Sequence, residues 1–118
     1  MQHGTSVTVL AAPATITANG NGSAVNVGDY HGLCLLHMNG IGTAGTTTVS
    51  LEHSDNGTDN WTAVPNTTFA QIGTAAKADT ILFNADRFKK FVRVKDVSAS
   101  SGSAIRSVVL VGNKRESQ

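Results

Sequence analysis

The sequence predicts an all-β protein, a two-sheet antiparallel β-sandwich of jelly-roll-like topology. Thr, Ser, Ala, Val and Gly dominate the 118-residue chain, and 12 glycines punctuate it where turns can require a positive φ. Apolar and polar residues alternate with the period of two that strands require. No stretch of ten or more residues carries the three-and-four apolar spacing of a helix.

Short strands separated by turn residues follow one another along the whole chain. The alternation places them at residues 5–11, 14–18, 23–27, 31–39, 46–54, 60–64, 67–72, 79–84, 89–97 and 104–112. Segments rich in Gly, Asn and Ser supply turns at 19–22, 39–45, 54–60 and 98–102. So many short strands favour two sheets that each bury one face, either as a jelly roll or, as the alternative, an immunoglobulin-like sandwich.

The strands differ in how many faces they are expected to bury. The strand at 46–54 alternates in the manner of a half-buried strand, with one face formed by Thr47, Val49, Leu51 and His53. The segment HGLCLLHMN at 31–39 is apolar on both faces, which indicates a central strand. In KKFVRVKDV, Val92 and Val94 lie opposite Arg93 and Lys95. These patterns predict a core that includes Cys34, Leu35, Val49, Leu51, Val94 and Val109.

The length of the chain fits one domain. We therefore expect a single β-sandwich domain over residues 1–118. The terminal segments MQHG and NKRESQ are expected to form short flexible ends at about 1–4 and 113–118.

The charge of the chain argues against two classes of partner. The formal net charge is +1, and charged residues make up 14% of the chain. Nucleic acids and anionic membranes attract clustered Lys and Arg, so we expect no specific nucleic acid and no membrane as partner. A low charge density suits a protein that ends up assembled. The first residues lack the basic and apolar regions of a secretory signal, so we expect synthesis in a cytoplasm.

No group of residues predicts catalysis, and we expect no enzymatic activity and no cofactor. His53, Ser54 and Asp55 are the residue types of a hydrolase triad, but neighbours in a strand point to opposite faces and cannot converge on one atom. The basic stretch RFKKFVRVK at 87–95 interleaves cations with aromatic rings, as in sites for single-stranded nucleic acid. The low net charge instead favours a central strand whose side chains alternate between core and solvent, with acidic residues elsewhere that neutralise the patch.

Metal binding is not expected either. His31 and His37 lie six residues apart on one strand, roughly 20 Å at about 3.3 Å per residue, which is too far for a shared metal. The loop that begins at Asp55 has Asn66 at its twelfth position, where a calcium loop needs a bidentate Glu. The single cysteine, Cys34, lies in an apolar run and is expected to be a buried core residue.

Two segments, LEHSDNGTDNWTAVPNTTF and FVRVKDVSASSGSAIRSVVLVGNKR, resemble a pattern of small structural proteins of tailed phages. The pattern is a strand that ends in an Asp-Gly turn, a Trp-Thr pair, a short strand, an aromatic-Val-Arg-Val strand and a closing valine-rich strand. It spans residues 46–112, and Asn56 stands where the pattern commonly has Asp. The resemblance implies architectural roles for His53, Ser54, Asp55, Gly57, Trp61, Val92 and Arg93.

The resemblance implies a capsid decoration or cement protein, made in the host cytoplasm and located on the capsid surface of the virion. Its partners would be the major capsid protein and copies of itself in a dimer or trimer. Two alternatives remain, a tail or neck component and a receptor-binding or glycan-binding module of the virion. Glycan sites usually present exposed aromatic rings, and aromatic residues are 5% of this chain.

Overall fold

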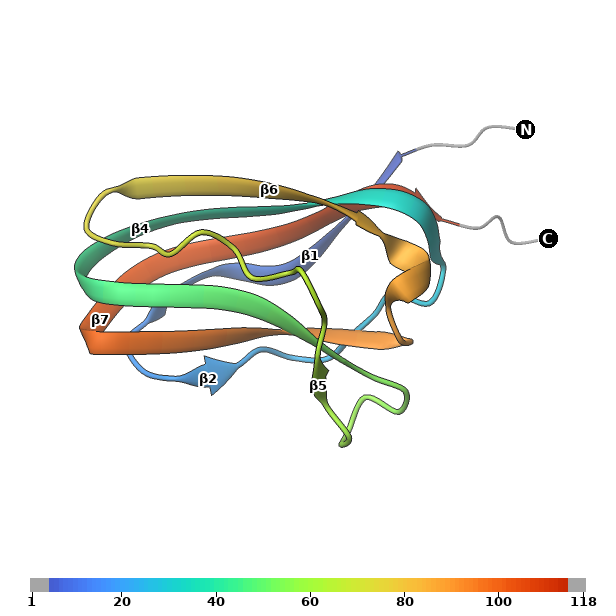
Figure 1. The fold of residues 1–118 in the computed structure, drawn as a ribbon, viewed down its shortest axis with the longest axis horizontal. Helices are drawn as coiled ribbons and strands as arrows, with labels where there is room; N and C mark the ends of the chain where they lie inside the picture. Colours follow the sequence, from blue (N-terminus) through green and yellow to red (C-terminus); the bar gives the residue numbers. More distant parts are fainter. Residues whose placement is uncertain (1–4, 115–118) are drawn as a thin grey trace.

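The computed structural model describes residues 5–114 (Figure 1). Within this range the chain forms seven strands and one short 3-10 helix, namely β1 (Thr5–Ile16), β2 (Gly20–Asn21), β3 (Val25–Asn26), β4 (Tyr30–Ser54), β5 (Thr62–Ala63), β6 (Ala76–Asn84), η1 (Ala85–Arg87) and β7 (Phe91–Lys114). Each pair of neighbouring strands is antiparallel. Among the described residues, no helix is long and apolar enough to span a membrane.

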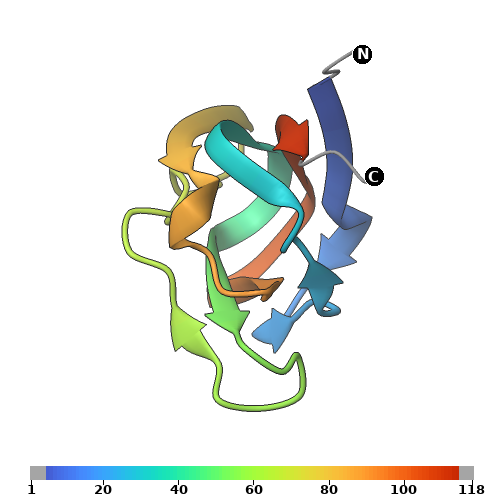
Figure 2. The same ribbon diagram turned by 90° about the vertical axis from the view of Figure 1, so that its right-hand side faces the viewer.

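Two long strands, β4 and β7, pair along most of their length and bend together, so one sheet folds back on itself into two layers (Figure 1). The first layer runs in the order β6, residues 30–41 of β4, residues 103–114 of β7, and β1. The second layer pairs residues 46–54 of β4 with residues 91–99 of β7, flanked by β5, β2 and β3. Figure 2 shows the curled sheet from its end, with β1 and β6 at opposite sides. The predicted all-β, jelly-roll-like sandwich is confirmed.

The bend of β4 and β7 depends on glycines at points of close backbone approach. A Cβ atom on Gly42 would lie 2.0 Å from the carbonyl oxygen of Gly73, and one on Gly102 would lie 2.4 Å from that of Thr46. Neither approach is possible for a real side chain, so only glycine fits. The pairing of β4 with β7 resumes past the bend with a shifted register, and most backbone groups therefore keep their partners.

This continuity corrects two predicted turns. Residues 39–45 and 98–102 are bends inside β4 and β7 and do not connect separate strands. Glycine-rich segments commonly reverse the chain, but here the two strands turn the corner side by side and continue their ladder. The strand predicted at 67–72 is reduced to a bridge between Ile72 and Thr47, although the Phe69 amide also donates to the Val49 carbonyl at 2.9 Å.

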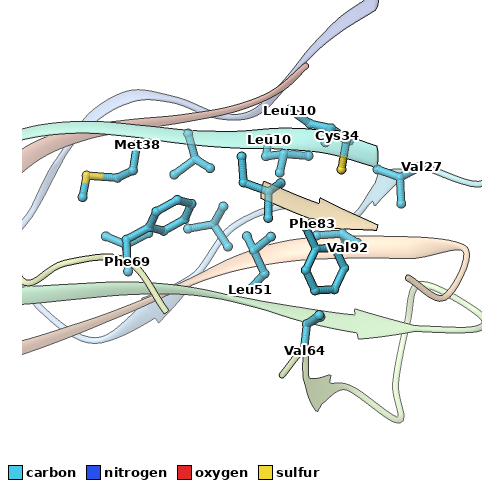
Figure 3. Close-up of a cluster of buried hydrophobic side chains, with 14 of the residues drawn as sticks. Leu10, Val27, Cys34, Met38, Leu51, Val64, Phe69, Phe83, Val92 and Leu110 are labelled. Atoms are coloured by element: carbon cyan, nitrogen blue, oxygen red, sulfur yellow. The ribbon is translucent and has the colours of Figure 1, made fainter. Parts of the chain in front are cut away.

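The core lies between the two layers and receives every second side chain from both (Figure 3). Among its fully buried members are Leu36, Met38, Val49, Leu51, Ile72, Val92, Val94, Val108 and Leu110. Because β4 and β7 each pass through both layers, these two strands supply most of the core. Burying a side chain of this size stabilises the fold by about 1.5–3 kcal/mol.

Four of the residues predicted to form the core are buried, namely Cys34, Val49, Leu51 and Val94. The prediction is wrong for Leu35, which is 42% exposed, and for Val109, which is half-buried. Both residues point away from the second layer, because side chains alternate along a strand and their neighbours Leu36 and Leu110 point inward. A strand that is apolar on both faces is therefore covered on only one face here.

The predicted flexible carboxyl-terminal end is also corrected in part. Asn113 pairs with Thr5 and His31, and Lys114 pairs with Tyr30, so both residues belong to β7. The remaining predicted ends, residues 1–4 and 115–118, lie outside the described residues.

A buried ion pair joins the two layers. Arg106, in the first layer, donates from Nε to Asp96 Oδ1 at 2.8 Å and from Nη2 to Asp96 Oδ2 at 2.6 Å. Asp96 lies in the second layer, and the two residues are only 3% and 5% exposed. Arg106 Nη1 also donates to the carbonyl oxygen of Ala12, at an irregularity in β1, at 3.2 Å. This bidentate pair fixes the two halves of β7 against each other.

Candidate interaction surface

The outer face of the first layer is the largest apolar feature of the described surface. Its side chains point away from the core on all four strands of the layer. Seven of them are exposed Val, Leu or Ile residues, namely Val7, Val9, Leu33, Leu35, Ile41, Leu82 and Ile105. The half-buried Val109 and Val111 lie between them on β7. We call this set the apolar face.

The strand register arranges the apolar face in rows that cross the layer. A bulky row consists of Leu82, Leu35, Val111 and Val7. The next row consists of Thr80, His37, Val109 and Val9. Directly opposed side chains on neighbouring strands touch one another. The bulky row is therefore a continuous apolar ridge from one edge of the layer to the other.

The apolar face carries no formal charge. Along β4 from Leu33 to Ile41, and at the outward positions paired with these residues, the described chain has no Asp, Glu, Lys or Arg. The one titratable group is His37, whose Nδ1 forms a hydrogen bond of 2.7 Å with Thr80 Oγ1. Protein surfaces normally mix charged and apolar side chains. An uncharged face of this extent indicates contact with another surface.

The exposed area of the apolar face supports the same conclusion. Given their exposed fractions, the seven residues present on the order of 700 Å² of apolar surface to solvent. Monomeric soluble proteins rarely expose contiguous apolar patches larger than a few hundred Å². A specific protein interface buries about 800 Å² on each partner. The apolar face is thus of the size that one interface needs.

A shallow hollow of about 490 Å³ lies on the apolar face, on the far side of the His37 row from the bulky row. Small side chains form its floor, among them Ala76, Ala78 and Ser107, and it is bordered by Ile41 and Ile105. Two basic residues, Lys77 and Arg106, also line it. The face therefore combines a ridge with a depression, and the depression is mostly apolar.

The outer face of the second layer has a different character. Glu52 and Arg93, which are paired across β4 and β7, form an ion pair with 2.9 Å between Arg93 Nη2 and Glu52 Oε1. The Arg93 guanidinium also lies 4.3 Å from the ring centroid of Trp61. Lys95 is exposed beside them. This face is polar and charged, although it is built from the same two long strands.

Four of the residues to which the phage resemblance assigns architectural roles lie in or beside the turn after β4, namely His53, Ser54, Asp55 and Gly57. Ser54 Oγ is buried and donates to the carbonyl oxygen of Asp59, while the Asn56 side chain accepts from the amides of Thr58 and Asp59 at 3.0 Å each. Gly57 has a φ of 77°. These contacts close the turn after β4, which is a structural role.

His53, Ser54 and Asp55 each make a contact with another part of the chain. His53 Nδ1 accepts from the backbone amide of Lys89 at 3.2 Å, so it is engaged by the neighbouring chain. Burial lowers the pKa of His53, the Lys89 charge lowers it further, and Asp55 partly opposes this shift. Asp55 is exposed and lies 3.9 Å from Lys89 Nζ. Val92, which pairs with His53, is buried in the core.

The other residue types that could carry chemistry are engaged in structure or dispersed. Within residues 5–114, no three of the His, Cys, Asp and Glu residues are grouped so that they could hold a metal ion. Burial raises the pKa of the Cys34 thiol to about 11, which suppresses its reactive thiolate. In the basic stretch, Lys90 lies 5.6 Å from the Phe91 ring centroid and Arg93 pairs with Glu52.

Two features escaped the sequence prediction. The apolar face was present in the sequence as strands that are apolar on both faces, a pattern that also describes a strand covered on both sides. The ion pair between Asp96 and Arg106 joins residues ten positions apart on one strand, which alternation alone places on the same face but roughly 30 Å apart. Only the bend brings them together.

Several solved structures share this fold at low sequence identity. The SPBc2 prophage-derived protein YomS is 14% identical over 93% of this chain and 96% of that chain, with a TM-score of 0.54. A chain of the Bacillus endospore appendages, which form disulfide-linked pili, is 13% identical over 98% and 93%, with a TM-score of 0.56. A chain of infectious bursal disease virus, Gx strain, is 10% identical over 99% of this chain but 33% of that chain, with a TM-score of 0.51.

No protein-family model matches the chain, and no curated protein matches it by sequence.

Proposed function

We propose that this protein is a structural subunit of a phage particle, and that it decorates the assembled capsid through protein-protein contacts. The observation that makes the chain a subunit of an assembly is the apolar face, an uncharged surface of interface size on a well-packed sandwich. Removal of such a surface from water stabilises a complex by roughly 25 cal/mol for each Å² buried. The free-energy costs of association are subtracted from this gain.

The kind of protein follows from two further lines of support. The turn and strand pattern over residues 46–112 resembles small structural proteins of tailed phages. Solved structures with this fold include a prophage-derived protein, a chain of a virus and a chain of the pili that form Bacillus endospore appendages. All three are compatible with a subunit that acts by packing against its neighbours.

The architecture suits a load-bearing subunit. The buried Asp96 and Arg106 pair and the continuous ladder between β4 and β7 hold the two layers in a fixed relation. A rigid subunit loses little conformational freedom when it docks, so more of its contact energy appears as affinity. Repeating the contact at many equivalent sites of a capsid would stabilise the shell against internal pressure.

The test is the copy number of the protein in purified particles of the phage that encodes it, measured by quantitative mass spectrometry against the major capsid protein. Hundreds of copies are expected for capsid decoration. Six or twelve copies would assign the protein to the tail or neck instead. Its absence from the particles would overturn the proposal.

A second measurement tests the decoration itself. Shells that lack the protein are mixed with the purified chain, and occupancy and the temperature of shell disruption are recorded. We expect saturable binding and a higher disruption temperature, because a ligand that binds only the intact shell stabilises it. Binding without any gain in disruption temperature would contradict the cement role.

A further inference from the structure

We propose that the apolar face is occupied by a second copy of this chain, in a face-to-face dimer whose two-fold axis runs across the strands along the His37 row. This inference deepens the proposed function. It rests on that proposal in one respect, namely that the apolar face is used in assembly. The dimer leaves the charged outer face of the second layer and the turn after β4 free for the capsid.

The area argues for a second copy. On the order of 700 Å² of apolar surface on each chain approaches the roughly 800 Å² that each partner contributes to a standard interface. A two-fold dimer is closed, since the same surface is used once by each copy and none is left over. Packing one first layer on the other would give an inner layer about 10 Å thick, as between the sheets of a sandwich.

The absence of charge also favours a second copy. Specific contacts between different proteins commonly use complementary charges to orient the partners. The apolar face has no Asp, Glu, Lys or Arg at the outward positions between Leu33 and Ile41 or at those paired with them in the described chain. An identical face meets this requirement on the other side, because the outward positions of both copies then bring no unpaired charge into the contact. Of the two basic residues that line the hollow, Arg106 is paired with Asp96, and Lys77 is exposed on β6, which among the described strands pairs only with β4.

The relief of the apolar face gives the position of the axis. The bulky row of Leu82, Leu35, Val111 and Val7 lies on one side of the His37 row. Ala78, Asn39 and Ser107 lie at the same distance on the other side of the His37 row, and they line the hollow. Rotation by 180° about the His37 row therefore places the ridge of each copy over the hollow of the other.

The same rotation predicts which residues meet. Leu33 and Ile41 lie four residues to either side of His37 on β4. Leu33 of one copy should therefore face Ile41 of the partner. Within one chain these two residues are roughly 26 Å apart at about 3.3 Å per residue, too far for direct contact. A charge pair at these positions thus reports on the dimer alone.

The first experiment compares two substitutions by sedimentation equilibrium of the full chain. Leu35→Glu places a charge in the apolar face, and Val97→Glu places the same charge on the outer face of the second layer. The two positions are matched in exposure at 42% and 38%. We expect the parent chain and Val97→Glu to be dimers, and we expect Leu35→Glu to raise the dimer Kd by at least about 100-fold.

Folding is controlled in the same samples by circular dichroism and thermal unfolding. Leu82→Glu, at a position that is 63% exposed, provides a second charge that the monomer readily solvates. We expect it to dissociate the dimer as Leu35→Glu does. A monomeric parent chain, or a dimer that survives both charges on the apolar face, would overturn the inference.

The second experiment tests the axis. Leu33→Lys alone should dissociate the dimer, since it buries a cation without a counter-ion and breaks an apolar contact across the axis. Adding Ile41→Glu in the same chain should recover at least about tenfold in affinity, because opposite charges then face each other across the axis. No recovery would overturn this arrangement of the copies.

Failure of this inference is distinguishable from failure of the proposed function. A chain that stays monomeric but occupies empty shells would keep the capsid role and exclude the dimer. A chain that dimerises through the apolar face but is absent from particles would keep the dimer and exclude the capsid role.

Discussion

The two outer faces of the sandwich differ although the same two strands build both. Where β4 and β7 cross the first layer, their outward residues include Leu33, Leu35 and Ile105. Where they cross the second layer, the outward residues include Glu52 and Arg93. Strand pairing and core packing are similar in the two layers, so they do not explain the difference. The apolar face has the composition of an interface, whereas the charged face mixes polar and charged side chains as ordinary protein surfaces do.

The largest effect is expected where the two layers are joined. Asp96→Ala leaves the buried Arg106 guanidinium without its counter-ion and should cost about 3–5 kcal/mol of stability. Urea unfolding monitored by circular dichroism measures this loss. The double variant Asp96→Ala with Arg106→Met, which leaves no buried charge at this place, should be less destabilised than the single one. Equal losses would show that the charge is not what matters there.

The inward and outward sides of β4 should respond differently to the same truncation. Leu36→Ala removes a fully buried side chain and should cost about 2–5 kcal/mol. Leu35→Ala, one residue away and 42% exposed, should cost less than about 1 kcal/mol in the monomer. Both variants are unfolded at a protein concentration below the dimer Kd, so that the measured loss of stability is that of the monomer. A large monomer effect of Leu35→Ala would contradict its place on the outer face.

The second layer should lose stability in acid through His53. Burial and the Lys89 charge lower the pKa of His53, so the folded state binds fewer protons than the unfolded state. Stability from this group is complete above the unfolded value of about 6.5 and falls as pH decreases through it towards the lower folded pKa. Unfolding free energies between pH 8 and pH 5 should show a shallower decline in His53→Asn. If His53→Asn had the same pH profile of stability as the parent chain, His53 would be excluded as the cause of the acid sensitivity.

The smallest effect is expected on the charged outer face. Glu52→Ala removes a partly solvated ion pair with Arg93 and should change stability by less than about 1 kcal/mol, with the difference reduced further in high salt. The same urea titration serves here. A loss of stability as large as that of Asp96→Ala would contradict the expectation that solvent weakens the Glu52–Arg93 pair relative to the buried pair.

The sequence was sufficient for the fold class because alternation with period two is a local property of each strand. It could not distinguish a bend from a hairpin at 39–45, since glycines serve both and only the partner strand decides. It also misplaced Leu35, because a segment that is apolar on both faces reads the same whether its second face is covered within the monomer or left for a partner. The turn at 54–60 was located correctly from its Asn, Asp and Gly residues, whereas the pairing of Asp96 with Arg106 depends on a bend that no local pattern predicts.

The pairing of β1 with the last part of β7 has a mechanical consequence. Thr5 is opposite Asn113, so the described chain enters and leaves the fold at the same end of one antiparallel ladder. A pull applied between these two points would load one pair of hydrogen bonds at a time and peel β1 away at low force. Pressure on the two outer faces would instead act on the packed side chains between the layers, which all bear it together. The described part of the chain is therefore expected to yield more readily to tension between Thr5 and Asn113 than to pressure on its two outer faces.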